Sequence, residues 1–198
     1  MTAGLAEFLA AALLMELTPG PNMSWLALLS LREGRIAGLR AVLGIMLGLT
    51  MLGVLSSVGV AGLMAQQPWI ANLLRWTGVA FMLFLAWEAW VGERGEVNPG
   101  ARQHFWRGVV VNLLNPKAAA VFLAVIPSFA DSAVDGPGKF LFFSAIYIAI
   151  ATLVHASIVV FSGSFRSLVN HPGREKPVRR IFAVLLAAIA IWMATLEA

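Results

Sequence analysis

Residues 112–119 read NLLNPKAA, and they lie inside a run from Val109 to Ile126 that is otherwise apolar. A similar interruption occurs earlier, where residues 16–22 read ELTPGPN between two apolar stretches. Asparagine, lysine and carboxylate groups are costly to bury in an apolar environment unless they find partners. The two interruptions therefore decide how we interpret the rest of the chain.

The composition indicates a membrane protein. Hydrophobic residues make up 60% of the 198 residues and charged residues only 12%, and the mean hydropathy is +0.83. Soluble domains carry about 25% charged residues, so we expect lipid to surround this chain. The net charge of +4 does not predict nucleic-acid binding, because excess Lys and Arg in membrane proteins mostly mark cytoplasmic loops. The sequence contains no cysteine, which excludes disulfides and thiolate metal sites.

Six segments are apolar enough to form transmembrane helices, each of which needs roughly 20 mostly apolar residues. The sequence thus predicts an all-α integral membrane protein, with one transporter domain over residues 1–198. No basic n-region precedes the first segment, so we interpret it as a retained span and not as a signal peptide. The predicted spans are residues 5–30, 39–64, 71–91, 105–129, 138–162 and 179–196, with the first and fourth interrupted.

The basic residues predict the orientation of these spans. Only Arg75 and Lys139 belong to the second and fourth loops and their margins, and Lys117 lies inside a span. The remaining basic residues flank the first, third and fifth loops, which the positive-inside rule places in the cytoplasm. Both termini are therefore expected on the outer side. The residues that carry this argument are Arg32, Arg35, Arg40, Arg94, Arg102, Arg107, Arg166, Arg174, Lys176, Arg179 and Arg180.

The positions of the two interruptions predict an internal repeat. Pro19 and Pro116 each fall in the first span of a three-span half, about residues 1–99 and 100–198. Three is an odd number, so the second half enters the membrane from the opposite side. Two halves with one fold are then related by an axis in the membrane plane. Interrupted helices at matching positions of inverted repeats point to the binding site of a transporter.

The first interruption has the local chemistry of a helix break. Pro19 and Pro21 have no backbone N–H to donate, and Gly20 is conformationally free. Residues before a proline avoid the α region, so we expect Thr18 and Gly20 to leave the helix. A new half-helix is expected to start near Pro21, with Asn22 in its first turn.

The second interruption predicts a half-helix with a lysine in its first turn. Asn115 is a favoured N-cap, and Pro116 is a favoured first helical residue. A lysine at the middle of a span, such as Lys117, costs about 2.5–3.5 kcal/mol on insertion scales. A carboxylate inside the membrane, water or an anionic substrate group must compensate for it. Asn112 and Asn115 are either part of the site or only helix caps.

The two breaks together predict a binding site for an amino acid. The N–H groups at a helix start favour an anion, so two half-helix starts and the Lys117 ammonium would hold a carboxylate. Glu16 would meet the amine; alternatively, it only pairs with Lys117 or faces the outer water. The candidate substrate-binding residues are Glu16, Thr18, Pro19, Gly20, Pro21, Asn22, Asn112, Asn115, Pro116 and Lys117.

A few other residues have expected roles. His155 lies in the fifth span, where an ionisable side chain is a functional candidate. Together with Glu16 it is our candidate for proton coupling; the alternative is a buried histidine bonded to a backbone carbonyl. Glu88 is expected to pair with a loop arginine at the membrane interface. Gly44 and Gly48 form a GxxxG motif, which allows close packing of helices.

At these residues the sequence resembles the lysine-exporter (LysE/RhtB) family of bacterial amino-acid exporters. TPGPN at residues 18–22 resembles the first-span signature, and REGRIAGLRAVLGIMLG at 32–48 resembles the basic, Gly-bearing segment after that signature. GVAFMLFLAWEAW at 78–90 resembles the third span, and FWRGVVVNLLNPKAAAVFLAVIPSF at 105–129 resembles the fourth. The resemblance implies a bacterial inner-membrane exporter of amino acids or related metabolites, driven by a proton or cation gradient without an ATPase domain.

The alternatives differ in the side chains that they need. A metal-ion exporter of related architecture needs several Asp, Glu or His converging in the spans. A membrane enzyme needs a nucleophile and base, and a scaffold protein gives Lys117 no purpose. We expect a transporter without catalytic residues, cofactor or resident metal, whose partners are a small-molecule substrate and the lipid bilayer. Six short spans leave little bulk around a cavity, so a homodimer fits this chain.

Overall fold

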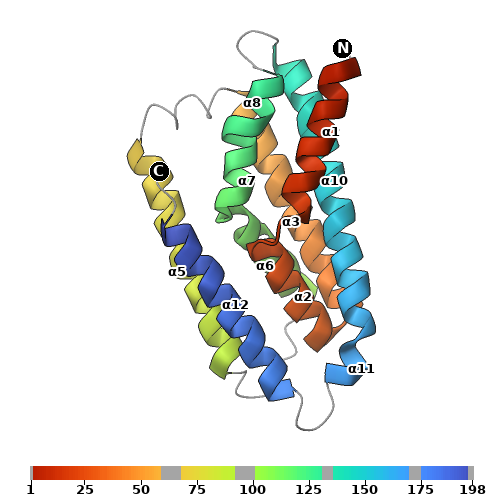
Figure 1. Cartoon of the computed structure of the whole chain (residues 1–198), viewed down its shortest axis with the longest axis vertical. Coiled ribbons are helices and arrows are strands. Elements are labelled where there is room, and N and C mark those ends of the chain that lie inside the picture. Colours follow the sequence, from red (N-terminus) through yellow and green to blue (C-terminus); the bar gives the residue numbers. More distant parts are fainter. Residues whose placement is uncertain (1, 59–67, 92–100, 131–135, 170–174, 196–198) are drawn as a thin grey trace.

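The computed structural model describes residues 2–58, 68–91, 101–130, 136–169 and 175–195, and these form helices without any strand. Helices occupy each segment predicted as a span and run roughly along the long axis of the molecule (Figure 1). Residues 59–64 and 196 of the predicted spans lie outside the described residues, as do Arg94 and Arg174. The bounds are α1 Thr2–Leu17, α2 Pro21–Glu33, α3 Arg35–Ser57, α5 Pro68–Val91, α6 Ala101–Leu113, α7 Pro116–Ala120, the π-helical turn η1 Val121–Val125, α8 Ile126–Phe129, α10 Pro137–Ser164, α11 Arg166–Val169 and α12 Glu175–Thr195.

Several of these helices are long and apolar enough to cross a membrane. By length and composition, three pass among the described residues: Arg35–Ser57, Pro137–Ser164 and Lys176–Thr195. The pair Arg102–Leu113 and Pro116–Phe129, which is bent by 54° at its break, adds a fourth if it forms one span. The chain is therefore a multi-pass membrane protein. Among the described residues, the third predicted span contributes a shorter apolar helix, Trp76–Val91, and the first is not among the helices that pass.

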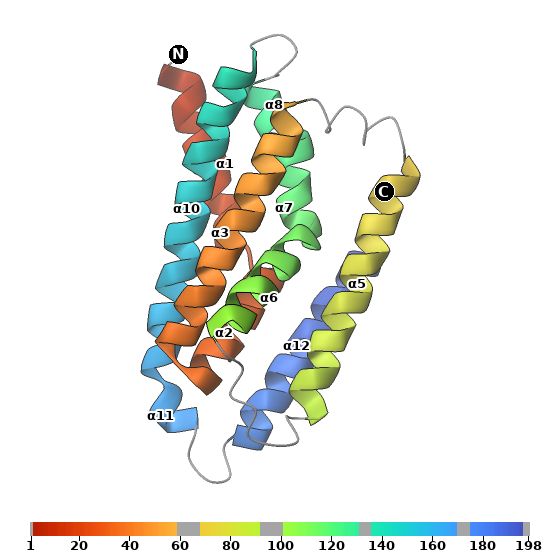
Figure 2. The ribbon, with the colours of Figure 1, turned by 180° about the vertical axis from the view of Figure 1, so that it is seen from behind.

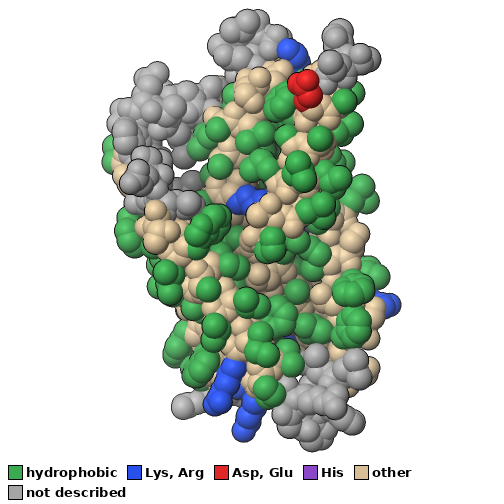
Figure 3. Space-filling view, in the orientation of Figure 1, with side chains coloured by type: hydrophobic (Ala, Val, Ile, Leu, Met, Phe, Trp, Pro, Cys, Tyr) green, Lys and Arg blue, Asp and Glu red, His purple; other side chains and the backbone are tan. Residues whose placement is uncertain are grey.

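The surface fits a lipid environment. Figure 3 shows hydrophobic side chains over most of one face, with Lys and Arg side chains at its lower end. Large side chains such as Trp87, Leu153 and Ile191 are more than half exposed. Monomeric soluble proteins rarely expose large contiguous apolar patches, so these side chains are placed to contact lipid.

The helices form a bundle with a pair beside it. α3 packs against α6, α10 and α2, and α12 packs mainly against α5 (Figures 1 and 2). Gly44 and Gly48 of α3 face α6, as the GxxxG motif predicts. A Cβ on Gly44 would overlap the Phe105 carbonyl oxygen, and one on Gly48 would lie 2.9 Å from Asn112 Nδ2. The motif therefore serves packing within this chain.

Ion pairs connect helices at one end of the bundle. Glu88 of α5 pairs with Arg107 of α6, as the prediction of an interfacial arginine partner requires. On the same helix, His104 Nε2 lies 3.1 Å from Glu33 Oε2 of α2. These contacts hold the ends of α2, α5 and α6 together, and they leave Glu88 away from the helix breaks.

Both predicted interruptions are helix breaks. α1 ends at Leu17 and α2 begins at Pro21, while α6 ends at Leu113 and α7 begins at Pro116. The two interrupted segments run in opposite directions along the long axis (Figures 1 and 2). The breaks therefore come from the local proline chemistry that the sequence indicates.

A π-helical turn, η1, directly follows α7. The sequence pattern does not predict this turn. It covers Val121–Val125 and runs into α8, whose second residue is Pro127. Proline has no N–H, so an α-helix here would leave the Leu123 carbonyl without its usual donor. Short π turns inside α-helices widen the hydrogen-bond spacing and are frequent at functional sites.

Candidate functional site

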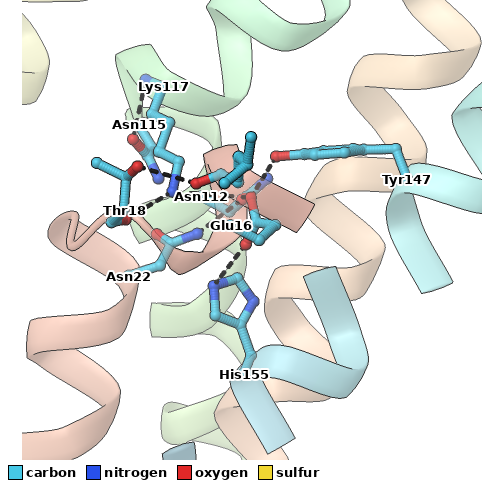
Figure 4. A network of polar contacts seen from close by, with 9 residues as sticks. Glu16, Thr18, Asn22, Asn112, Asn115, Lys117, Tyr147 and His155 are labelled. Atoms are coloured by element: carbon cyan, nitrogen blue, oxygen red, sulfur yellow. Dashed lines mark hydrogen bonds and ion pairs between the residues drawn. The ribbon is translucent and has the colours of Figure 1, made fainter. Parts of the chain in front are cut away.

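The candidate site lies where the two breaks meet the middle of α10 (Figure 4). Glu16 comes from the last turn of α1, and Lys117 from the first turn of α7. Thr18, Asn115 and Lys117 lie on one side of Glu16, while α10 brings residues from the other. Buried polar side chains of the site, each at most 5% exposed, are Glu16, Asn22, Asn112, Asn115 and His155.

Glu16 is the centre of the polar contacts. Its Oε1 accepts a hydrogen bond from Tyr147 Oη at 2.6 Å and lies 3.9 Å from Lys117 Nζ. Its Oε2 lies 3.5 Å from His155 Nε2. A buried carboxylate is tolerated only when it is paired and hydrogen-bonded. With 3% exposure, Glu16 does not face outer water in this conformation.

Lys117 reaches across to the first break. Its Nζ donates a hydrogen bond to the Thr18 carbonyl oxygen at 2.9 Å. That carbonyl lies just past the C-terminal end of α1, where unpaired carbonyls and the negative end of the helix dipole favour a cation. The end of α1 and the Glu16 carboxylate together offset the cost of a lysine at this depth. The sequence indicates the carboxylate as a partner for Lys117 but gives no sign of the carbonyl.

Two asparagines join the half-helices. Asn22 Nδ2 of α2 donates to Asn112 Oδ1 of α6 at 3.1 Å. The other side-chain atoms, Asn22 Oδ1 and Asn112 Nδ2, are buried and have no hydrogen-bond partner among the described residues. Since buried polar groups rarely stay unpaired, these atoms are candidates to bind a water or a ligand. Asn112 is therefore more than a helix cap.

The two half-helix starts differ in their caps. At the second, Asn115 Oδ1 accepts from the Lys117 backbone N–H at 3.0 Å, and Pro116 is the first residue of α7. The prediction of an N-cap at Asn115 is thus confirmed, and the Asn115 side chain binds one of the first-turn amides of α7. At the first, the N-cap residue is Gly20, and no side chain caps α2. No side-chain acceptor therefore occupies the first-turn amides of α2.

Two cavities flank Lys117. One lies beside Glu16, Tyr147 and His155 and has a volume of about 10 Å³, which is room for roughly one water. The other lies between the two breaks and α12, with a volume of about 250 Å³. Three residues line both: Gly20, Asn115 and Lys117. The exposed residues of the first break, Thr18 and Pro19, line the larger cavity.

Known proteins resemble this chain along most of its length. The model of the LysE type translocator family matches residues 13–196. The chain belongs to this family. An uncharacterized membrane protein of Pseudomonas aeruginosa is 28% identical over 82% of each chain. A leucine efflux protein of Salmonella typhimurium is 25% identical over 96% of this chain and 94% of its own. No solved structure gives a significant match.

One residue of the candidate site could have been identified from the sequence but was not. Tyr147 is the only tyrosine of the chain, and it is 1% exposed. It lies on one face of α10 with Ser144, Ala151 and His155, at helical spacings of three and four residues. That spacing, within an apolar span that also holds the unexplained His155, is the signal that could have identified it.

The His, Asp and Glu side chains of the chain bear on whether it is a metal-ion exporter. Within the described parts of the chain, no group of three or more His, Asp or Glu side chains is arranged to hold a metal ion. Glu16 and His155 supply two such side chains at the candidate site. A translocator is a transport protein, so the family describes a transporter and not an enzyme.

Proposed function

We propose that this chain is a secondary-active exporter of amino acids or closely related metabolites, which bind between the two helix breaks. One observation carries the proposal: the partly buried Lys117 ammonium lies 3.9 Å from the buried Glu16 carboxylate where the breaks meet. Ionisable side chains inside a membrane mark transport pathways. The leucine efflux protein to which the chain is similar supports an amino acid as the substrate class.

The geometry suits the two charges of a free amino acid. The 3.9 Å separation of Lys117 Nζ and Glu16 Oε1 exceeds hydrogen-bond length, so the two groups face each other without a direct hydrogen bond. The substrate carboxylate would bind Lys117 and the uncapped start of α2, and its amine would bind Glu16. The polar cavity holds only about one water, so the breaks must move apart to admit the substrate.

Proton coupling is part of the proposal, with Glu16 and His155 as the groups that exchange the proton. Their side chains are 3.5 Å apart and buried inside the bundle. A proton on Glu16 would remove the charge that binds the amine, so proton and substrate would compete for one site. Such competition produces exchange of one for the other, which is what an exporter driven by a proton gradient needs.

The proposed architecture is a single domain over residues 1–198 with six spans in two inverted halves. The opposite directions of the two interrupted segments support it (Figures 1 and 2). We place both termini on the outer side of a bacterial inner membrane, because the end of α2, the helix α11 and the start of α12, which carry Arg32, Arg166 and Lys176, lie at the opposite end of the molecule from the start of α1.

Transport by inside-out membrane vesicles tests the proposal. Vesicles with an acidic lumen are given a labelled amino-acid mixture, and accumulation is measured with and without a protonophore. We expect accumulation that the protonophore abolishes and that Lys117→Ala reduces to background. Lys139→Ala, an exposed lysine away from the breaks, is the matched control. Undiminished accumulation in Lys117→Ala would exclude the proposed site.

The same vesicles separate the metal alternative. They are given divalent metal ions in place of amino acids, and metal accumulation is measured. An amino-acid exporter accumulates no metal above vesicles without the protein. Metal accumulation that depends on Glu16 and His155, without amino-acid accumulation, would favour a metal-ion exporter.

A further inference from the structure

We infer that the 250 Å³ cavity beside Lys117 receives the substrate side chain, and that the substrates are amino acids with an apolar side chain larger than that of alanine. This rests on the proposed function, because it takes the charged groups of the amino acid to be bound by Lys117 and Glu16. It adds the substrate class and assigns α12, which lies outside the charged site, to selectivity.

The position of the cavity supports this assignment. Lys117, Gly20 and Asn115 form its border with the polar cavity that contains Glu16. A Cβ on Gly20 would lie 3.5 Å from Lys117 Cδ, so the absence of a side chain there keeps the border thin. A molecule with its carboxylate at Lys117 and its amine toward Glu16 would therefore place its side chain in this cavity.

The walls of the cavity are mostly apolar. Met15 of α1, Ala120 of α7, and Trp192 and Met193 of α12 line it beyond the two breaks. Lys117 is the one charged residue among the lining residues. The polar lining residues Thr18, Asn115 and Lys117 all belong to the breaks, so a charged or amide side chain that extends past them toward α12 would lose its water for few partners, whereas an apolar side chain gains by leaving water.

The size of the cavity sets a lower limit on the side chain that it would bind well. A cavity of about 150 Å³ lined by apolar side chains holds a benzene-sized group. At about 250 Å³ this cavity accommodates a branched aliphatic or aromatic side chain. A methyl group would leave most of it unfilled and lose the contacts that apolar walls provide.

Two substitutions in the wall change the volume in opposite directions. Ala120→Leu fills part of the cavity, and Trp192→Ala enlarges it. Trp192 is 54% exposed, so its replacement does not open a packed core. Ile191→Ala is the matched control, because Ile191 is the neighbouring residue of α12, is 63% exposed and does not line the cavity.

The test measures accumulation of single labelled amino acids in inside-out vesicles. We expect leucine, methionine and phenylalanine to accumulate at least tenfold faster than serine, lysine or glutamate. Ala120→Leu should lower the leucine-to-alanine rate ratio at least tenfold. Trp192→Ala should raise the phenylalanine-to-leucine ratio severalfold, and Ile191→Ala should change neither ratio.

The outcomes separate this inference from the proposed function. Faster transport of serine, lysine or glutamate than of leucine would overturn the inference and leave amino-acid export intact. Unchanged ratios in both wall variants would do the same. If Ala120→Leu does not fold, Trp192→Ala decides alone. Accumulation of no amino acid by the parent protein would overturn both.

Discussion

The first break, between Leu17 and Pro21, and the second, between Leu113 and Pro116, end and restart their helices in different ways. The second is capped by its own Asn115 side chain. The first has a glycine at the cap position and no side-chain cap. It also leaves the Thr18 carbonyl for Lys117, which belongs to the other break.

The difference assigns separate roles to the two breaks. At the second break, the Asn115 cap and Pro116 fix the start of α7. This fixed start positions the Lys117 side chain. The first supplies the groups that Lys117 contacts, together with uncapped amides at the start of α2. Two breaks with similar sequence signals can thus contribute complementary groups to the proposed binding site.

Removing the carboxylate at the first break is expected to have the largest effect. Glu16→Gln removes the buried carboxylate that lies 3.9 Å from Lys117, and the cost of breaking a fully buried ion pair, about 3–5 kcal/mol, is the upper limit for this partly exposed pair. Thermal unfolding in detergent should show a strong loss of stability, and vesicle transport should be lost. The double variant Glu16→Gln/Lys117→Met should recover much of the stability but no transport. A single variant as stable as the parent would show that the breaks are not coupled by charge.

Loss of the Tyr147 hydroxyl is expected to have the next largest effect. Tyr147→Phe removes the 2.6 Å hydrogen bond to Glu16, and a hydrogen bond to a charged group contributes about 1.5–3 kcal/mol. We expect a clear loss of thermal stability and slower transport. Ser157→Ala is the control. This exposed hydroxyl lies on the same helix and, among the described residues, donates its hydrogen bond to the Leu153 carbonyl. Equal stability of Tyr147→Phe and the control would contradict a role for the hydroxyl in fixing Glu16.

The cap of the second break gives a smaller effect. Asn115→Ala removes the acceptor of the Lys117 amide, and loss of an N-cap typically costs about 1 kcal/mol. The expected result is a modest fall in unfolding temperature. Asn115→Ser, which keeps a capping oxygen, should retain most of the stability. If alanine and serine behave alike, the second break is not held by its cap.

The corresponding change at the first break is expected to have the smallest effect. Gly20 has an extended backbone with φ of −153°, and an added Cβ makes only ordinary contact with Lys117. Gly20→Ala should therefore change stability by less than about 0.5 kcal/mol. Gly34→Ala is the contrasting control, because Gly34 has φ of +94°, where alanine is strained. A loss at Gly20 as large as that at Asn115 would remove the contrast between the breaks.

Much of the fold could be predicted because its determinants are local. Pro19, Pro21 and Pro116 interrupt helices through missing N–H groups and steric exclusion, whatever surrounds them. The Asn115 cap results from the same short-range rules. The apolar segments predict where helices occur, and the described residues of each predicted segment are helical apart from residues 18–20 and 114–115 at the two breaks and Val58 after α3.

The partners within the site could not be predicted because they depend on packing between distant segments. Lys117 and the Thr18 carbonyl are 99 residues apart, and Tyr147 and Glu16 are 131 apart. Backbone carbonyls carry no sequence signal, since every residue has one. A single tyrosine among phenylalanines likewise predicts no partner until the helix face is known.

The π-helical turn at Val121–Val125 sets the rotational phase between α7 and α8. An α-helix advances about 100° for each residue, so removing one residue from this turn would rotate Pro116–Ala120 by about that angle against the anchored α8. The Lys117 side chain would then leave α1 and point along a different side of the bundle. The direction in which the Lys117 side chain points thus depends on the one extra residue of the π-helical turn, a full helical turn away.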